Sequence, residues 1–187
     1  MSKGAYTDFL SAIGQRESGN NYSVVATPGY LGRFQFDEGA LKAIGFYNGD
    51  TTTAIDFIGS WTSKAASYGV ASKADFLASH AAQDAAILDW FNLLDQELTR
   101  ENLQGYEGQT IGGVLITESG MLAGAHLAGV GGLKAFLTSG GSQNFADFNG
   151  THVSDYLSQF GGYDTPYPDG AASGSTSPPP AASTPTS

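Results

Sequence analysis

Glu17 stands at the end of an apolar, helix-like segment, in the stretch IGQRESGNNYSVV (residues 13–25). A negative charge at the C-terminal end of a helix interacts unfavourably with the helix dipole and costs a few tenths of a kcal/mol. A solvated side chain would explain such a residue. A carboxyl held beside a groove, where its surroundings favour the protonated form, would instead be suited to acid catalysis. We interpret Glu17 as a candidate catalytic acid.

Cleavage of a glycosidic bond is a reaction that such a carboxyl can serve. The leaving oxygen must receive a proton, and a carboxyl delivers one near neutral pH when desolvation disfavours its charged form. Most glycosidases also need a second carboxylate as nucleophile or base. Asp37 and Glu38 are expected instead to begin a helix, where acids favour the dipole, and Glu118, in a second ESG triplet, is expected to be exposed. The sequence therefore favours a mechanism with a single carboxyl.

Four short stretches stand out: Glu-Ser-Gly-x-x-Tyr (17–22), Gly-x-x-Gln-Phe (32–36), AHLAGVGG (125–132) and FNGTHVSDYLSQF (148–160). The first three, in this order, resemble the soluble lytic transglycosylase branch of the lysozyme superfamily, over about residues 5–160. The resemblance implies a lysozyme-like α-domain with a glycan cleft. It also implies cleavage of the bond between N-acetylmuramic acid and N-acetylglucosamine in peptidoglycan, where the substrate's own 6-hydroxyl attacks and yields a 1,6-anhydro sugar.

The same resemblance implies roles for individual residues. Glu17 takes the place of the catalytic acid, the family's Gly-Leu-Met-Gln motif corresponds to residues 32–35, and its Ala-Tyr-Asn-x-Gly motif to residues 125–129. His126 and Leu127 depart from that second motif, because the family has a Tyr and an Asn at these two positions. That Tyr normally bonds to the catalytic Glu. His126 could hydrogen-bond to Glu17 in place of the Tyr. The implied substrate-binding residues are Ser18, Tyr22, Tyr30, Gly32, Phe34, Gln35 and His126.

The aromatic residues of segment 22–36 leave two interpretations open. Tyr22, Tyr30, Phe34 and Phe36 could stack on sugar faces in the cleft, or they could belong to the core, where aromatic side chains usually lie.

Two polar pairs are expected to be structural: Arg33 with Asp37, and His80 with Asp84 at the edge of a helix. Arg33 could instead steer an anionic stem-peptide carboxylate. The three histidines are widely separated, and no pair of them shows metal-ligand spacing together with acids. Neither a metal nor a cofactor is predicted.

The composition restricts the partners of the 187-residue chain. It contains no cysteine, which excludes disulfides and thiolate metal sites. Eight basic residues against 18 acidic ones give a formal net charge of −10, the opposite balance from that of a nucleic-acid-binding protein. No run of about 20 apolar residues occurs, so no membrane span is predicted. The expected partners are peptidoglycan glycan strands.

The expected place of action is the bacterial cell wall or periplasm. The start, MSKGAYTDFLSAIG, has no apolar run of signal-peptide length, and a negative net charge weakens capture by an anionic wall. We therefore expect delivery by a phage virion or a secretion machine, with the C-terminal tail joining the domain to a larger assembly. The alternatives are a muramidase of the same fold, a non-catalytic lysozyme-like structural component of such an assembly, and a glycan-binding module.

The elements that must position these residues read as helices, so we predict an all-α domain. The Ser72 helix begins at a capping box with Asp75, and its buried stripe includes Leu88. The domain is predicted to span residues 1–163, followed by a Pro/Ser/Thr-rich flexible tail or linker, 164–187. Helices are predicted at 5–16, 36–47, 52–61, 72–98, 110–141 (in two or three pieces) and 150–163, with a loop or irregular strand at 18–34.

Overall fold

The computed structural model describes residues 1–147 and 150–167 of the chain. It is mostly helical, which confirms the predicted helical class, and it also contains two small antiparallel sheets. The helices are α1 (Tyr6–Ser18), α2 (Glu38–Ala43), α3 (Ser63–Ala66), α4 (Lys73–Ala78), α5 (His80–Arg100), the 3₁₀ turn η1 (Gln104–Tyr106), α6 (Glu118–Thr138) and α7 (Val153–Phe160). The sheets are the hairpins β1 (Val25–Ala26) with β2 (Tyr30–Leu31), and β3 (Thr110–Ile111) with β4 (Val114–Leu115).

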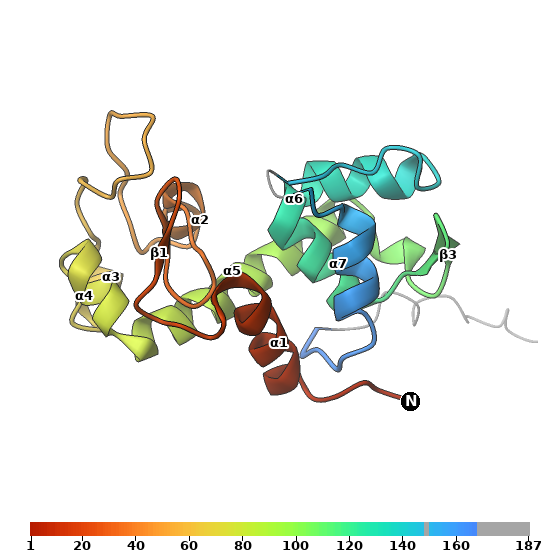
Figure 1. Ribbon diagram of the computed structural model, residues 1–187, viewed down its shortest axis with the longest axis horizontal. Coiled ribbons are helices and arrows are strands. Elements are labelled where there is room, and N and C mark those ends of the chain that lie inside the picture. The colour runs from red at the N-terminus through yellow and green to blue at the C-terminus, as the bar shows by residue number, and fades with distance from the viewer. Residues whose placement is uncertain (148–149, 168–187) are drawn as a thin grey trace, which may run out of the picture.

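Two lobes are joined by α5, which runs along the long axis of the molecule (Figure 1). One lobe holds the β1–β2 hairpin with α2, α3 and α4, and the other holds α6, α7 and the β3–β4 hairpin. Helix α1 lies in the middle, where the Phe9 ring packs on the Phe91 ring of α5 with centroids 5.2 Å apart. The C-terminal end of α1, which carries Glu17, can therefore contact segments from both lobes.

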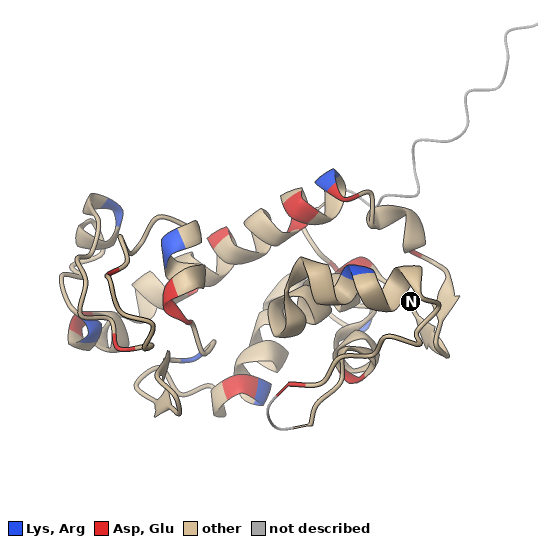
Figure 2. Ribbon diagram, turned by 90° about the horizontal axis from the view of Figure 1, so that it is seen from above, with Lys and Arg blue, Asp and Glu red and all other residues tan. Residues whose placement is uncertain are grey.

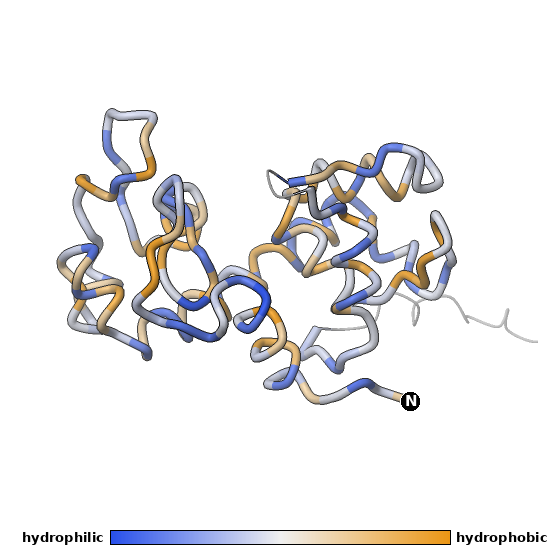
Figure 3. The backbone as a smooth tube through the Cα atoms, in the orientation of Figure 1, coloured by the Kyte–Doolittle hydropathy of each residue, from blue (hydrophilic) through white to orange (hydrophobic). Residues whose placement is uncertain are grey.

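The core is rich in aromatic side chains and extends into both lobes. Figure 3 shows hydrophobic segments within each lobe rather than at one end of the molecule. Full burial of a large apolar side chain contributes about 1.5–3 kcal/mol, so these rings are a main source of stability. The phenylalanines that are at most 1% exposed are Phe9, Phe34, Phe36, Phe46, Phe76, Phe91, Phe136 and Phe160.

Helix α6 packs closely against α7 because small residues line its first half. A Cβ atom added at Gly120 would lie 2.9 Å from the carbonyl oxygen of Leu157 in α7, a separation that real Cβ atoms avoid. The helix kinks at Gly129, whose φ of 68° and ψ of 164° are not helical. The prediction of helices broken at glycines is confirmed for this part of segment 110–141, whereas the hairpin at its start was not predicted.

Helix α6 is also long and apolar enough to cross a membrane by length and composition alone. Half of its most apolar window is buried inside the protein. A buried core helix meets the same test, so the expectation that this chain has no membrane span stays a prediction.

The prediction of a helix at 52–61 is wrong. This segment is a loop, in which Phe57 has a positive φ of 57°. Its backbone N–H groups donate to acidic side chains and not to the backbone carbonyls of a helix. Those of Asp56 and Phe57 donate to Glu38 Oε1, and that of Thr52 donates to Asp50. The nearby Asp50 and the distant Glu38 of α2 therefore take N–H groups that a helix would need.

The helix predicted over 72–98 is interrupted at Ser79. Ser72 caps α4 as predicted, with its side chain accepting from the N–H of Asp75. Ser79 has extended backbone angles (φ −97°, ψ 96°) and caps a second helix, α5, by accepting from the N–H of Ala82. The predicted apolar stripe is nevertheless buried on both sides of the break, at Phe76 and at Ile87, whereas Leu88 is 46% exposed instead of buried.

The predicted tail, 164–187, falls mainly on residues outside the described ones. Within the described part, the N–H of Asp164 donates to the carbonyl of Gly4, and the hydroxyls of Tyr167 and Tyr6 lie 3.2 Å apart. Residues up to Tyr167 thus pack on the start of α1. In the described part, Lys and Arg are scattered singly over the molecule, without a basic patch (Figure 2).

Candidate active site

Glu17 lies in the last turn of α1, which ends at Gly19 in the left-handed conformation (φ 66°). The N–H groups of Gly19 and Asn20 bond back to the carbonyls of Gln15 and Gly14, so the end of the helix is fixed. The Glu17 side chain is 18% exposed. It is therefore a partly buried acid, rather than a fully solvated helix-end residue.

Tyr156 of α7 holds the Glu17 carboxylate. Its hydroxyl donates to Glu17 Oε1 at 2.6 Å, across 139 positions of sequence. Burial, followed by the negative charge of Glu17, raises the pKa of Tyr156, so this phenol stays a neutral donor. Arg16 lies over the Tyr156 ring at 5.7 Å. The stretch 148–160 stands out in the sequence, but no role was predicted for its tyrosine.

His126 of α6 is the second group that faces Glu17. Its Nε2 atom lies 3.9 Å from Glu17 Oε1, which is longer than a hydrogen bond, and its side chain is 10% exposed. Trp90 of α5 donates its indole N–H to Nδ1 of the same ring at 3.0 Å. Burial lowers the pKa of His126, while the carboxylates of Glu17 and Asp37 act in the opposite direction. The expected bond from His126 to Glu17 is thus absent, and Tyr156 makes it instead.

The turn around Gly32 forms as the sequence predicted. Gly32 has a φ of 70°, and a Cβ atom there would lie 2.0 Å from Gln83 Oε1. The same Gln83 oxygen accepts from the backbone N–H of Arg33 at 2.9 Å. Only glycine fits such a position, because both its backbone angles and its contact with α5 exclude a side chain.

Gln35, which was expected to line a cleft, uses its amide group within the turn. Its Nε2 donates to the carbonyl of Gly32 at 2.7 Å, and its Oε1 is buried without a hydrogen-bond partner among the described residues. Ser18 likewise serves the backbone: its hydroxyl donates to the carbonyl of Arg33 at 2.8 Å and accepts from the N–H of Asn21. Ser18 therefore ties the end of α1 to this turn.

The polar pairs expected from the sequence are wrong. Arg33 pairs with Asp84 of α5 (3.2 Å) and not with Asp37. Tyr22 completes this cluster, since its hydroxyl donates to Asp84 and accepts from Arg33, both at 2.8 Å. His80 stacks on the Tyr22 ring, with centroids 3.8 Å apart. These contacts fasten the 18–34 segment to α5. Burial, followed by the bond to Asp84, raises the pKa of Tyr22, while Arg33 acts in the opposite direction.

The aromatic residues proposed for the cleft divide into two groups. Phe34 and Phe36 are 0% and 1% exposed, so the prediction that Phe34 binds substrate is wrong, because a fully buried ring cannot contact a glycan. Tyr22 and Tyr30 are half-buried and keep part of their surface for a ligand.

The other acids considered in the sequence have different surroundings. Asp37 is the N-cap of α2 and accepts from the N–H of Ala40 at 2.6 Å, as predicted. Glu118 was expected to be exposed but is 3% exposed, since it begins α6 inside the core and hydrogen-bonds to Asp95. Burial raises the pKa of Asp95 in this pair of acids. Glu118 thus cannot reach a substrate.

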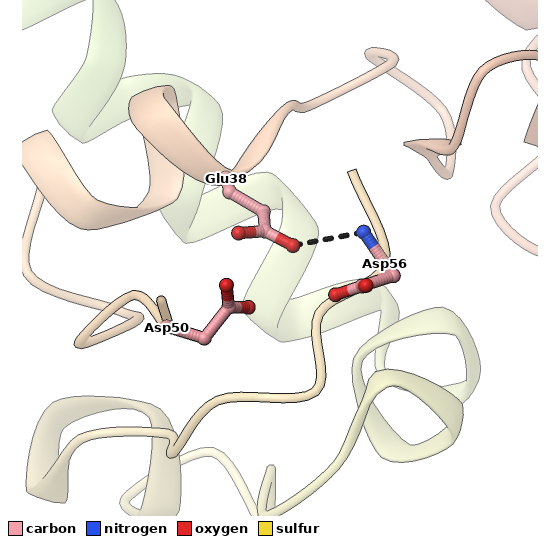
Figure 4. A group of neighbouring side chains, drawn as sticks. All are labelled: Glu38, Asp50 and Asp56. Atoms are coloured by element: carbon pink, nitrogen blue, oxygen red, sulfur yellow. Dashed lines mark hydrogen bonds between the residues drawn. The ribbon is translucent and has the colours of Figure 1, made fainter. Parts of the chain in front are cut away.

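Glu38, Asp50 and Asp56 form a separate acidic group, in which one oxygen of each carboxylate lies within 4.8 Å of the others (Figure 4). Oxygen ligands of this type suit hard cations. These carboxylates already serve the protein, however: Glu38 accepts from two N–H groups of the 52–61 loop. The N–H of Thr52 and the hydroxyl of Tyr47 lower the pKa of Asp50. The group acts as a clamp for the loop, and we assign no cation to it.

No family model, curated protein or solved structure matches this chain. The interpretation of the site therefore rests on its geometry. One partly exposed carboxyl, Glu17, is held by a neutral phenol and faced by a neutral imidazole, with Asp37 nearby. Such an arrangement can donate a proton and then stabilise the resulting carboxylate.

Proposed function

We propose that this protein is a peptidoglycan lytic transglycosylase with a lysozyme-like fold, which cleaves the N-acetylmuramic acid–N-acetylglucosamine bond with Glu17 as its acid and base. The observation that carries the proposal is the 2.6 Å bond from Tyr156 to Glu17. It supplies the phenol–carboxylate contact that the family motif would place at position 126, where this chain has His126.

In this proposal Glu17 first protonates the glycosidic oxygen. The carboxylate so formed is stabilised by the Tyr156 hydroxyl and then accepts the proton of the substrate's 6-hydroxyl, which attacks the sugar carbon and closes the 1,6-anhydro ring. Glu17 ends the cycle protonated, so one carboxyl serves both steps. The proposed partners are glycan strands, reached at the cell wall as part of a larger delivery assembly.

A second candidate function is hydrolysis by the same fold. It is favoured by Asp37, because the charges of Asp37 and Glu17 both act on the imidazole of His126. In an inverting glycosidase a second carboxylate activates water on the opposite face of the sugar. Asp37 would take that role, whereas Glu38 and Glu118 are committed to the loop clamp and the core.

Digestion of purified peptidoglycan, followed by mass spectrometry of the soluble products, tests both candidates. We expect anhydro-muropeptides from the wild type and a loss of at least about a hundredfold in their release with Glu17→Gln. Glu97→Gln is the matched control, because it makes the same chemical change at a glutamate that pairs with Arg100 on α5 and is not part of the candidate site. Products with reducing ends would favour hydrolysis. No release by a folded wild-type protein would overturn both functions and favour a binding or structural role.

A further inference from the structure

We propose that Trp90 is a positioning residue, which fixes His126 as the tautomer with its proton on Nε2. The imidazole then presents an N–H, and not a lone pair, to the carboxyl of Glu17. The role in catalysis rests on the proposed function, whereas the assignment of the tautomer does not.

The hydrogen-bonding capacity of indole decides which nitrogen of His126 carries the proton. The Trp90 side chain has one polar group, an N–H that donates and cannot accept. It lies 3.0 Å from Nδ1 of His126, so Nδ1 must accept and carries no proton. In a neutral imidazole the proton is then on Nε2, the atom that lies 3.9 Å from Glu17 Oε1.

The surroundings of the ring support a neutral imidazole. From α1 it is faced by Glu17, from the N-cap of α2 by Asp37, and from α5 by Trp90 and by Phe91, whose ring centroid lies 5.8 Å away. The two carboxylates favour the cation, but burial outweighs them and lowers the pKa of His126. Protonation would also place an N–H on Nδ1, directly against the Trp90 N–H.

The tautomer matters because a lone pair on Nε2 would compete for the proton of Glu17. A lone pair on Nε2 is a hydrogen-bond acceptor, so it would draw that proton towards His126 and away from the glycosidic oxygen. With the proton on Nε2 the lone pair points at Trp90, and the proton of Glu17 stays available. The Nε2–H also faces the carboxylate that forms after proton transfer.

The tautomer can be measured directly on the full chain by long-range ¹H–¹⁵N NMR of the histidine rings at neutral pH. We expect His126 to show an unprotonated Nδ1 and a protonated Nε2. In Trp90→Phe, which keeps an apolar ring but removes the N–H, we expect mixed tautomers and a higher pH midpoint of the His126 titration. A protonated Nδ1 in the wild type, or an unchanged ring in the variant, would overturn the assignment.

The matched control is Trp61→Phe, since the chain has two tryptophans. The indole nitrogen of Trp61 is buried and has no hydrogen-bond partner among the described residues. This variant undergoes the same chemical change away from His126, so it should leave the NMR pattern of His126 as in the wild type. Circular dichroism of each variant shows whether it is folded.

Kinetics test the positioning role separately. In Trp90→Phe the Nε2 lone pair of His126 can face Glu17 and the imidazole titrates at higher pH, so we expect the alkaline limb of the peptidoglycan-cleavage profile to move, with about a tenfold fall in kcat at neutral pH. In a His126→Gln background, Trp90→Phe should cause no further movement of that limb. An unchanged limb in the single variant would refute the role while the proposed function stands. A wild type that is inactive but shows the expected tautomer would refute the proposed function, and with it the role.

Discussion

The hydroxyl of Tyr156, close to the end of the described chain, donates to the carboxylate of Glu17 in the first helix at 2.6 Å. This bond joins α7 to α1 and fixes the orientation of the Glu17 side chain. Helix α6 adds His126, which faces Glu17, and α5 adds Trp90, which bonds to His126. The site is therefore assembled from four helices, and each can be tested by a small change in one side chain.

Removal of the Tyr156 hydroxyl should reduce both activity and stability. We expect Tyr156→Phe to lower kcat about ten- to a hundredfold, because one donor to the Glu17 carboxylate is lost. We also expect a loss of about 1.5–3 kcal/mol in the free energy of unfolding, since the bond involves a charged partner. Turnover assays and urea unfolding measure the two effects. Tyr68→Phe, at a 39% exposed tyrosine stacked on Phe46, is the control; equal effects in both variants would contradict the assignment.

Asp37→Asn distinguishes the two candidate reactions. Asparagine caps a helix about as well as aspartate does, so the bond from the N–H of Ala40 is kept while the charge is removed. We expect a transglycosylase to retain activity within about threefold. A loss of about a hundredfold or more, together with reducing-end products in the wild type, would identify Asp37 as a catalytic base.

Gly32→Ala should destabilise the protein by more than backbone strain alone. Strain in the left-handed region costs about 1–2 kcal/mol, and here a Cβ atom would also meet Gln83 Oε1 at 2.0 Å. We expect a total loss of about 3–5 kcal/mol in the free energy of unfolding. Gly45→Ala provides the comparison, since Gly45 has a φ of 74° with nothing within 4 Å of an added Cβ. Equal losses in the two variants would show that contact with Gln83 is unimportant.

The buried pair of Asp95 and Glu118 should make stability depend on pH. Burial raises the pKa of Asp95, so the folded state holds a proton that the unfolded state releases near pH 4. The resulting stabilisation is fully present below that pH and is lost as the pH rises through the folded-state pKa. We expect Asp95→Asn to flatten the decline in urea-measured stability above pH 4, and Glu97→Gln to leave it. If stability declines as steeply in Asp95→Asn as in the wild type, other groups cause the decline.

Much of the local structure could be predicted because its signals lie within a few residues of one another. Ser72 caps its helix with the N–H of Asp75, the turn at Gly32 needs a residue without a side chain, and Asp37 begins α2. One failure was also local in origin. Ser79 has the same capping chemistry as Ser72, but its place inside an apparently continuous apolar stripe concealed the break.

The sequence by itself determined the helical class, the ends of several helices and the identity of the candidate acid, Glu17. Only the tertiary structure decided what surrounds that acid. Tyr156 reaches it across 139 positions, and Trp90 reaches His126 across 36. Such pairs depend on how α5, α6 and α7 pack on α1, and packing is set by the shapes of many side chains at once. The spacing of residues along the chain does not reveal these contacts.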